Sequence, residues 1–268
     1  MEVFFYVIIF IMGITFGSFY TLAVYRIPKG EDITHTHSYC PNCNHKLNII
    51  DLIPVFSYIF LGGKCRYCKN KIRPRYLILE TISGLFFVVI AYLMKLSIYT
   101  LELNQIIEYA FFVLYFTFII LIAGIDKEKR IINKFVLMYG VIISIMYIVY
   151  LYIIETTSIY RYVIYLVLFI LLLAIDTISL KKHAKNNYTY SILMLVMVMT
   201  IFTGEYATIS SIITTLIFIS IYLLYKKLKN RKNIKTTEQF NNNIQIGYYL
   251  SIFNIVYFIA ILALCRLI

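Results

Sequence analysis

VFFYVIIFIMGITFGSFYTLAVY, residues 3–25, is an uncharged run of 23 residues. About 20 apolar residues in a helix cross the hydrocarbon core of a bilayer, so this run predicts a membrane-spanning helix. Similar runs recur along the 268 residues, of which 61% are hydrophobic and 14% charged, with a mean hydropathy of +0.81. This composition excludes a water-soluble globule and predicts an all-α polytopic membrane protein.

Eight apolar segments have the length, or nearly the length, of a membrane span. Because lipid cannot hydrogen-bond a free backbone amide, we expect each segment to be a helix. Small residues in the first two segments, Gly13, Gly17, Ser83 and Gly84, predict close helix contacts. The predicted spans are Val3–Tyr25, Tyr76–Leu96, Ile106–Ile125, Phe135–Ile153, Tyr160–Leu180, Thr189–Thr203, Ala207–Tyr225 and Ile246–Cys265.

The basic residues predict the orientation of these helices. Threading eight spans leaves four loops on one side, and they hold 22 of the 25 Lys and Arg residues. By the positive-inside rule this side is the cytoplasm, so both termini lie outside, in a multi-pass protein of the inner or cytoplasmic membrane. The net charge of +12 is thus explained by orientation and membrane lipid, and we expect no nucleic-acid partner. The four loops are 26–75, 126–134, 181–188 and 226–245.

The largest of these loops, residues 26–75 between the first two helices, contains two CxxC pairs. They are Cys40-Pro41-Asn42-Cys43 and Cys65-Arg66-Tyr67-Cys68. Four thiolates from two such pairs can close a tetrahedral shell around zinc, so we predict a structural, zinc-ribbon-like cytoplasmic loop. Unmetallated cysteines and redox chemistry are the alternatives. His35, His37 and His45 lie nearby, but four cysteines already complete the shell.

The same region resembles the N-terminal domain of type IV prepilin peptidases. The resemblance covers residues 10–90 and divides the chain into residues 1–97, with the zinc loop, and a membrane peptidase-like helical domain at 98–268. The residues that carry it are Gly17-Ser18-Phe19, Arg26-Ile27-Pro28-Lys29-Gly30, Cys40-Pro41-Asn42-Cys43, Asp51 through Tyr58, Gly63 through Cys68, Arg75-Tyr76 and Glu80.

The resemblance implies a membrane aspartic endopeptidase. Such an enzyme cleaves the leader of type IV pilin or pseudopilin precursors at the cytoplasmic face of the membrane. Many members also N-methylate the new N-terminus, which implies S-adenosylmethionine as a methyl donor. Aspartic chemistry needs two carboxylates that share a proton, one acting on water and the other on the carbonyl.

Asp126 resembles the first catalytic Asp of this family, with Asn133 in the place of its usual Pro. The second motif, a Gly-x-Gly-Asp some 60 to 65 residues later, is not recognisable, since Tyr188-Thr189 and their neighbours supply no carboxylate. Asp176 lies at nearly the same predicted depth as Asp126, so it is the candidate replacement. Its alternative role is that of a polar residue at a helix interface.

Two functions therefore remain open at the level of the sequence. The first is a prepilin-type peptidase that uses Asp126 and Asp176. The second is a catalytically degenerate relative that binds pilin-like precursors or partners without cleaving them. A secondary transporter is a weaker third hypothesis, because the sequence shows neither repeated halves nor broken helices at the membrane midplane.

Overall fold

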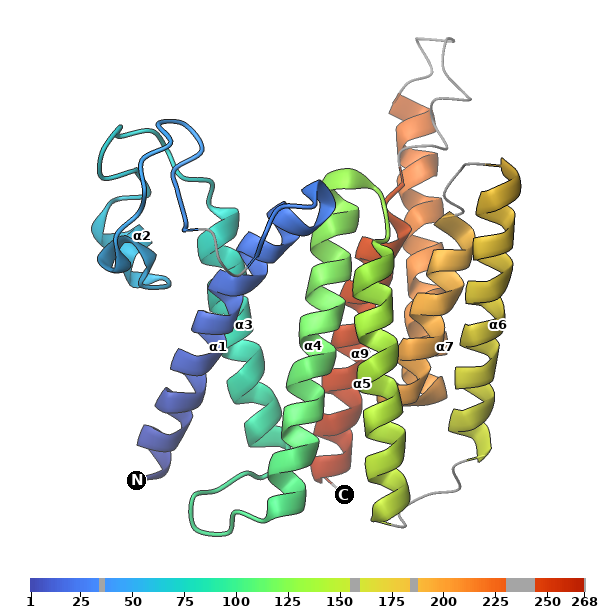
Figure 1. Cartoon of the computed structure of the whole chain (residues 1–268). Coiled ribbons are helices and arrows are strands. Elements are labelled where there is room, and N and C mark those ends of the chain that lie inside the picture. Colours follow the sequence, from blue (N-terminus) through green and yellow to red (C-terminus); the bar gives the residue numbers. More distant parts are fainter. Residues whose placement is uncertain (34–36, 155–159, 184–187, 230–243, 268) are drawn as a thin grey trace. The chain divides into compact units, whose positions relative to one another are not determined.

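The computed structural model describes residues 1–33, 37–154, 160–183, 188–229 and 244–267, and these are mainly helical (Figure 1). The predicted all-α class is confirmed. The helices are α1 (Glu2–Arg26), η1 (Ile27–Lys29), η2 (Ile49–Leu52), α2 (Phe56–Phe60), α3 (Arg75–Leu93), α4 (Leu103–Lys129), α5 (Lys134–Ile153), α6 (Tyr160–His183), α7 (Tyr188–Lys229) and α9 (Ile246–Leu267).

Within the described residues, six helical segments are long and apolar enough to cross a membrane, and α6 adds a shorter apolar stretch, Tyr160–Ile175. Seven of the eight predicted spans lie wholly in these helices, and two of them share α7; the span Tyr76–Leu96 was predicted too long, since α3 ends at Leu93. The last turn of α4 extends past the predicted end at Ile125, so Asp126 is helical and not in a loop. The chain forms two compact units, Met1–Ala110 and Phe111–Ile268.

In the first unit, α1 packs closely against α3 because glycines remove side chains at their crossing. A Cβ atom placed on Gly13 would lie 2.7 Å from the Gly84 Cα atom, and one placed on Gly17 would lie 2.7 Å from the Glu80 Cα atom. Both contacts are with backbone, which cannot move aside as a flexible side chain can. The close contacts predicted for these small residues are confirmed.

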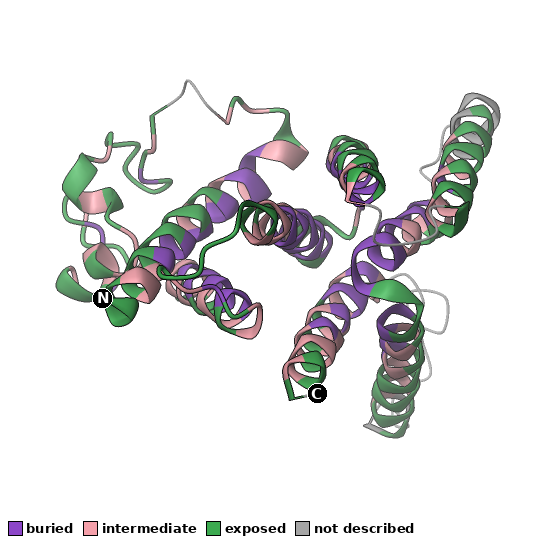
Figure 2. Cartoon of the chain, turned by 90° about the horizontal axis from the view of Figure 1, so that it is seen from below, coloured by how far each residue is buried: buried purple, intermediate pink, exposed green. Residues whose placement is uncertain are grey.

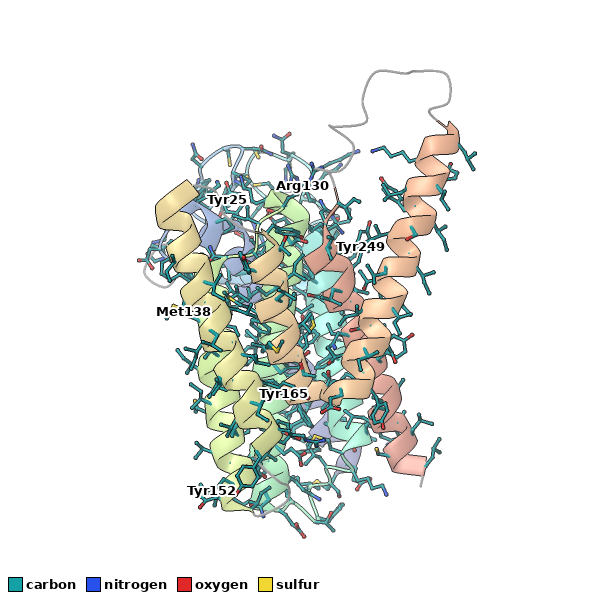
Figure 3. The ribbon with its side chains drawn as sticks, turned by 90° about the vertical axis from the view of Figure 1, so that its right-hand side faces the viewer. Tyr25, Arg130, Met138, Tyr152, Tyr165 and Tyr249 are labelled. Atoms are coloured by element: carbon teal, nitrogen blue, oxygen red, sulfur yellow. The ribbon has the colours of Figure 1, made fainter. Side chains whose placement is uncertain are left out.

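In the second unit, α7 turns back on itself at Gly204 (Figure 3). Gly204 has φ 78° and ψ 170°, a conformation that only glycine adopts readily. This bend explains how one continuous helical segment contains two predicted spans.

A buried polar network joins α7 to α4 and α9 beside this bend. Tyr115 of α4 donates to the Asn254 side chain of α9 at 2.5 Å, and Asn254 donates to Thr203 of α7 at 3.2 Å. Since an unpaired polar group is costly in an apolar interior, these bonds fix the three helices in register. Figure 2 shows buried residues along the inner faces of the helices in each unit, with exposed residues on their outer faces.

Candidate metal centre and buried carboxylate site

The four predicted zinc ligands of the 26–75 loop lie together. The Sγ atoms of Cys40, Cys43, Cys65 and Cys68 all lie within 4.8 Å of one another, and the Cys40 and Cys68 sulfurs are 3.8 Å apart. Four sulfurs at about 2.3 Å from a tetrahedral zinc would be about 3.8 Å apart. The donor set and its spacing therefore fit a metal ion with a closed coordination shell.

The two CxxC pairs have the same local structure. In the first, the Cys40 N–H donates to the His45 carbonyl and the Asn44 N–H donates to the Cys40 carbonyl. In the second, Cys65 pairs with Asn70, and Lys69 with Cys65, in the same pattern. Asn44 and Lys69, each one residue after its pair, have φ values of 56° and 59°. This left-handed residue turns the chain back, so that the next carbonyl, of His45 or Asn70, reaches the N–H of the first cysteine of the pair.

Hydrogen bonds from the backbone prepare the Cys65 sulfur for metal binding. The N–H groups of Cys68 and Tyr67 point at this sulfur and, against the opposing effect of burial, lower the pKa of the Cys65 thiol from 9.0 to about 7. Metal ions bind the thiolate and not the thiol, so this geometry favours the ligating form at Cys65. At Cys68, the Asn70 N–H opposes but does not outweigh burial and hydrogen bonds with the other three sulfurs, which raise the pKa of the Cys68 thiol to about 11.

An ion pair and a ring contact hold the second knuckle against the rest of the loop. Arg66 Nε lies 2.6 Å from Asp51 Oδ1, and the Tyr67 ring lies over the His45 ring with 3.6 Å between centroids. Burial of Asp51 opposes ionisation, but hydrogen bonds from Arg66 and the Asn48 N–H outweigh it and lower the pKa of Asp51 below 3.8. Asp51 is thus a structural residue of the loop. His45 is in this ring contact, while His35 lies outside the described residues.

Glu80 of α3 supports an unusual turn in the same loop. Its carboxylate accepts a 2.7 Å hydrogen bond from the Val55 N–H. Val55 has φ 64° and ψ −54°, and the Phe56 N–H bonds the Pro54 carbonyl at 2.6 Å, which makes a γ-turn that is rare and strained. Glu80 and Val55 both belong to the motif that the sequence analysis singled out, but nothing in the sequence alone indicates that they touch.

In the second unit, Asp126 is completely buried in the last turn of α4. The Tyr188 hydroxyl donates to Asp126 Oδ1 at 2.8 Å, and the Tyr248 backbone N–H donates to Oδ2 at 2.9 Å. Tyr188 also accepts a 3.1 Å hydrogen bond from the Gly247 N–H. Among the described residues, no other carboxylate hydrogen-bonds Asp126.

The Asp126 carboxyl group therefore lies at the N-terminus of α9. The first N–H groups of a helix have no partners within the helix and carry a partial positive charge, which suits an acidic side chain. Gly247 permits this contact, since a Cβ atom there would lie 3.1 Å from Asp126 Oδ2. Gln245 completes the connection by donating to the Lys127 carbonyl at 2.8 Å.

A pocket of about 170 Å³ lies at the same end of α9. Arg130 and Gln245 line it together with Ile244 and with apolar and tyrosine side chains of α7 and α9. Both residues also contact the turn that carries Asp126. The Arg130 N–H donates to the Asp126 carbonyl, and the Gln245 side chain donates to the Lys127 carbonyl. Figure 3 shows Arg130 and Tyr249 at one end of the unit, opposite Tyr152.

Asp176, the predicted partner of Asp126, lies on α6, but its side chain is outside the described part of the structure. Its pairing with Asp126 stays a prediction. Tyr188 was not predicted, although its separation of 62 residues from Asp126 falls where the second motif was sought. The neighbouring Thr189 is exposed. The segment expected to supply the second carboxylate thus reaches Asp126, with a tyrosine in contact.

Comparison with known proteins supports the resemblance over the N-terminal third of the chain. Residues 11–94 match the family described as Bacterial Peptidase A24 N-terminal domain. The chain is 35% identical over 92 residues to a prepilin leader peptidase/N-methyltransferase of Klebsiella pneumoniae, covering 32% of this chain and 40% of that protein. It is 35% identical over 120 residues to one of Vibrio cholerae (41% and 44%), and 39% identical over 80 residues to one of Bacillus subtilis (30% and 32%).

The matches thus span less than half the length of these relatives. No solved structure matches the chain. Residues 11–94 are thus similar to the N-terminal domain of the type IV prepilin peptidases.

Proposed function

We propose that this chain is a prepilin-type leader peptidase, which cleaves type IV pilin or pseudopilin precursors at the cytoplasmic face of the membrane. The observation that carries the proposal is the hydrogen bond between Asp126 and Tyr188. Asp126 matches the first motif of the family, and Tyr188 lies at the spacing of the second. The contact supports a site assembled from both motif regions.

In this proposal Asp126 is one half of an aspartic pair and Asp176 is the other. Two carboxyl groups that share a proton can act together, one as base toward water and one as acid toward the scissile carbonyl. Tyr188 and the N-terminus of α9 then orient the Asp126 carboxyl group, since each of its oxygens accepts one of their hydrogen bonds. Tyr188 is a positioning residue in this scheme.

One observation favours a second candidate, a catalytically degenerate relative that binds precursors without cleaving them. Both oxygens of Asp126 already stabilise the junction of α4, α7 and α9, so its burial is explained without catalysis. A tyrosine cannot replace a carboxylate as proton-sharing partner at neutral pH, because its pKa is ordinarily near 10.

The proposed cofactors follow from the donor set and from the relatives. Cys40, Cys43, Cys65 and Cys68 would hold one structural zinc ion, whose closed shell leaves no position for catalysis. The metal would stabilise a loop with little apolar core. S-adenosylmethionine is proposed as a second cofactor because the relatives are named prepilin leader peptidase/N-methyltransferase.

We further propose that the basic end of the helices faces the cytoplasm and that both termini lie outside. Cysteines introduced at exposed Lys129 and exposed Tyr152, in a Cys265→Ser background, test this orientation. An impermeant thiol reagent added to intact cells should label Tyr152→Cys and spare Lys129→Cys. The reverse pattern would overturn the orientation.

The peptidase proposal is tested by co-expression with a pilin-like precursor. Wild type should convert the precursor to a shorter product, and Asp126→Asn should not. Asp32→Asn is the matched control, because Asp32 is exposed in the zinc loop and should leave cleavage unchanged. If wild type yields no product while its fold and metal content are intact, the degenerate relative becomes the better description.

A further inference from the structure

The exposed apolar side chains of the 26–75 loop are concentrated in a single segment, η2 and α2. Ile49 is 85% exposed and Phe60 is 84% exposed, and five further apolar residues between them are also exposed. A loop surrounded by water would gain by burying such side chains. We call this surface the loop patch: Ile49, Ile50, Leu52, Ile53, Phe56, Ile59 and Phe60.

Three residues of the patch form one exposed face of α2. Phe56, Ile59 and Phe60 stand at i, i+3 and i+4 of α2, so they share one face of that helix. Tyr58 points inward, where its hydroxyl lies near Gly63 and donates to the Ile72 carbonyl at 3.4 Å. α2 therefore has an exposed apolar face, which is its outer face, and an opposite face on which Tyr58 contacts the rest of the loop.

The depth of the patch is set by the Glu80–Val55 hydrogen bond. Glu80 is five residues beyond the start of α3, or about 7.5 Å along a helix that is long and apolar enough to cross the membrane. Val55 immediately precedes α2, so α2 begins beside the first turns of α3 (Figure 1). The outer face of α2 is thereby held at the level where a spanning helix enters the bilayer.

Basic residues follow the patch in the sequence. Lys64, Arg66, Lys69, Lys71 and Arg73 follow α2 before α3 begins, and all five are exposed. An apolar face with neighbouring Lys and Arg is the pattern of segments that lie in the interface of anionic membranes.

We propose that the loop patch rests in the headgroup–acyl boundary of the membrane that the chain spans. The Cys40/Cys43/Cys65/Cys68 knuckles are then fixed at the membrane surface by three attachments: α1, α3 and the patch. This inference concerns the lipid contacts of the loop and does not depend on peptidase activity.

The absence of tryptophan from the sequence provides a direct test. Phe60→Trp places a sole tryptophan in the patch of the full-length protein, and Tyr39→Trp places one on the exposed surface of the first knuckle as control. Both are reconstituted in vesicles of phosphatidylethanolamine and phosphatidylglycerol, with or without brominated acyl chains. Phe60→Trp should lose most of its emission in brominated vesicles, and Tyr39→Trp should keep its emission and be quenched by aqueous iodide.

A Phe60→Trp signal that iodide quenches and brominated lipid does not would overturn the proposal. So would a Phe60→Trp emission that shifts only when a pilin-like precursor is added, since the patch would then bind that protein. If Phe60→Trp fails to fold, Ile49→Trp at the other end of the patch takes its place, with the same outcomes.

Discussion

Removing one hydroxyl, in Tyr188→Phe, should destabilise the second unit markedly. Tyr188 donates to Asp126 Oδ1 at 2.8 Å and accepts from the Gly247 N–H at 3.1 Å. The substitution preserves the ring and deprives two polar groups of a partner at once. Each such loss costs about 1–3 kcal/mol, so we expect a decrease of about 3 kcal/mol in the free energy of unfolding.

Thermal unfolding of the purified protein measures this loss. With a shift of about 2–4 °C per kcal/mol for units of 150–250 residues, the midpoint should fall by about 6–12 °C. Tyr248→Phe is the matched control, because Tyr248 contacts Asp126 through its backbone N–H and its hydroxyl only meets exposed Lys127. The control should change the midpoint little.

A double-mutant cycle separates the hydrogen bonds from general packing. In an Asp126→Ala background, Tyr188→Phe should cost less than in wild type, because one of the two partners is already gone. Equal costs in both backgrounds, or equal midpoints for Tyr188→Phe and Tyr248→Phe, would refute the reasoning.

Three further changes test the first unit. Cys40→Ser should reduce the zinc content measured on purified protein from one ion per chain to well below one, because three thiolates leave the shell incomplete. Gly13→Ala should lower the unfolding free energy by about 1–3 kcal/mol, measured by thermal unfolding, because the new Cβ atom would meet α3 backbone at 2.7 Å. Arg66→Gln should raise the pKa of Asp51 toward 3.8. The loss of loop stability caused by this substitution should be complete above pH 3.8 and should disappear as the pH falls through the lowered pKa that Asp51 has in the wild type. Thermal stability measured against pH shows this change.

Each of these changes has a control in the same region. Cys265→Ser should retain the zinc, Thr15→Ala on the exposed face of α1 should retain stability, and Lys64→Gln should leave the pH profile unchanged. Full zinc in Cys40→Ser, or an unchanged midpoint in Gly13→Ala, would contradict the proposed ligand set or the close packing of α1 on α3. If the difference in thermal stability between Arg66→Gln and wild type stays constant as the pH falls from 3.8 through the lowered Asp51 pKa, the proposed role of the Asp51–Arg66 pair is contradicted.

The sequence predicted the features that depend on composition and local spacing. Apolar runs determine membrane helices, so each of the eight predicted spans coincides with a helical segment, and only Tyr76–Leu96 extends past its helix, by three residues. Two CxxC pairs determine a four-sulfur cluster because each knuckle is a local structure, and its sulfurs need only one long-range contact. Gly13 and Gly17 were informative since small residues at this spacing have few other uses in a spanning helix.

What the sequence did not predict depends on contacts between distant segments. Tyr188 was overlooked because a tyrosine in an apolar segment carries no sign of its partner, and only the fold brings it to Asp126. The contact of Asp126 with the N-terminus of α9 was missed for the same reason, since it joins residues 122 positions apart. The Glu80–Val55 hydrogen bond requires a strained turn at Val55, and no residue type in this segment indicates such a turn.

Cleavage of a pilin-like precursor by single and double Asp variants tests the central claim most directly. If Asp126 and Asp176 act as a pair, Asp126→Asn and Asp176→Asn should each abolish cleavage, and the double variant should be no worse than either single one, because the groups act as a unit. All variants are compared at equal expression and zinc content. Full cleavage by Asp176→Asn, with cleavage lost in Asp126→Asn, would contradict the pair, and full cleavage by Asp126→Asn would contradict the assignment of the site itself.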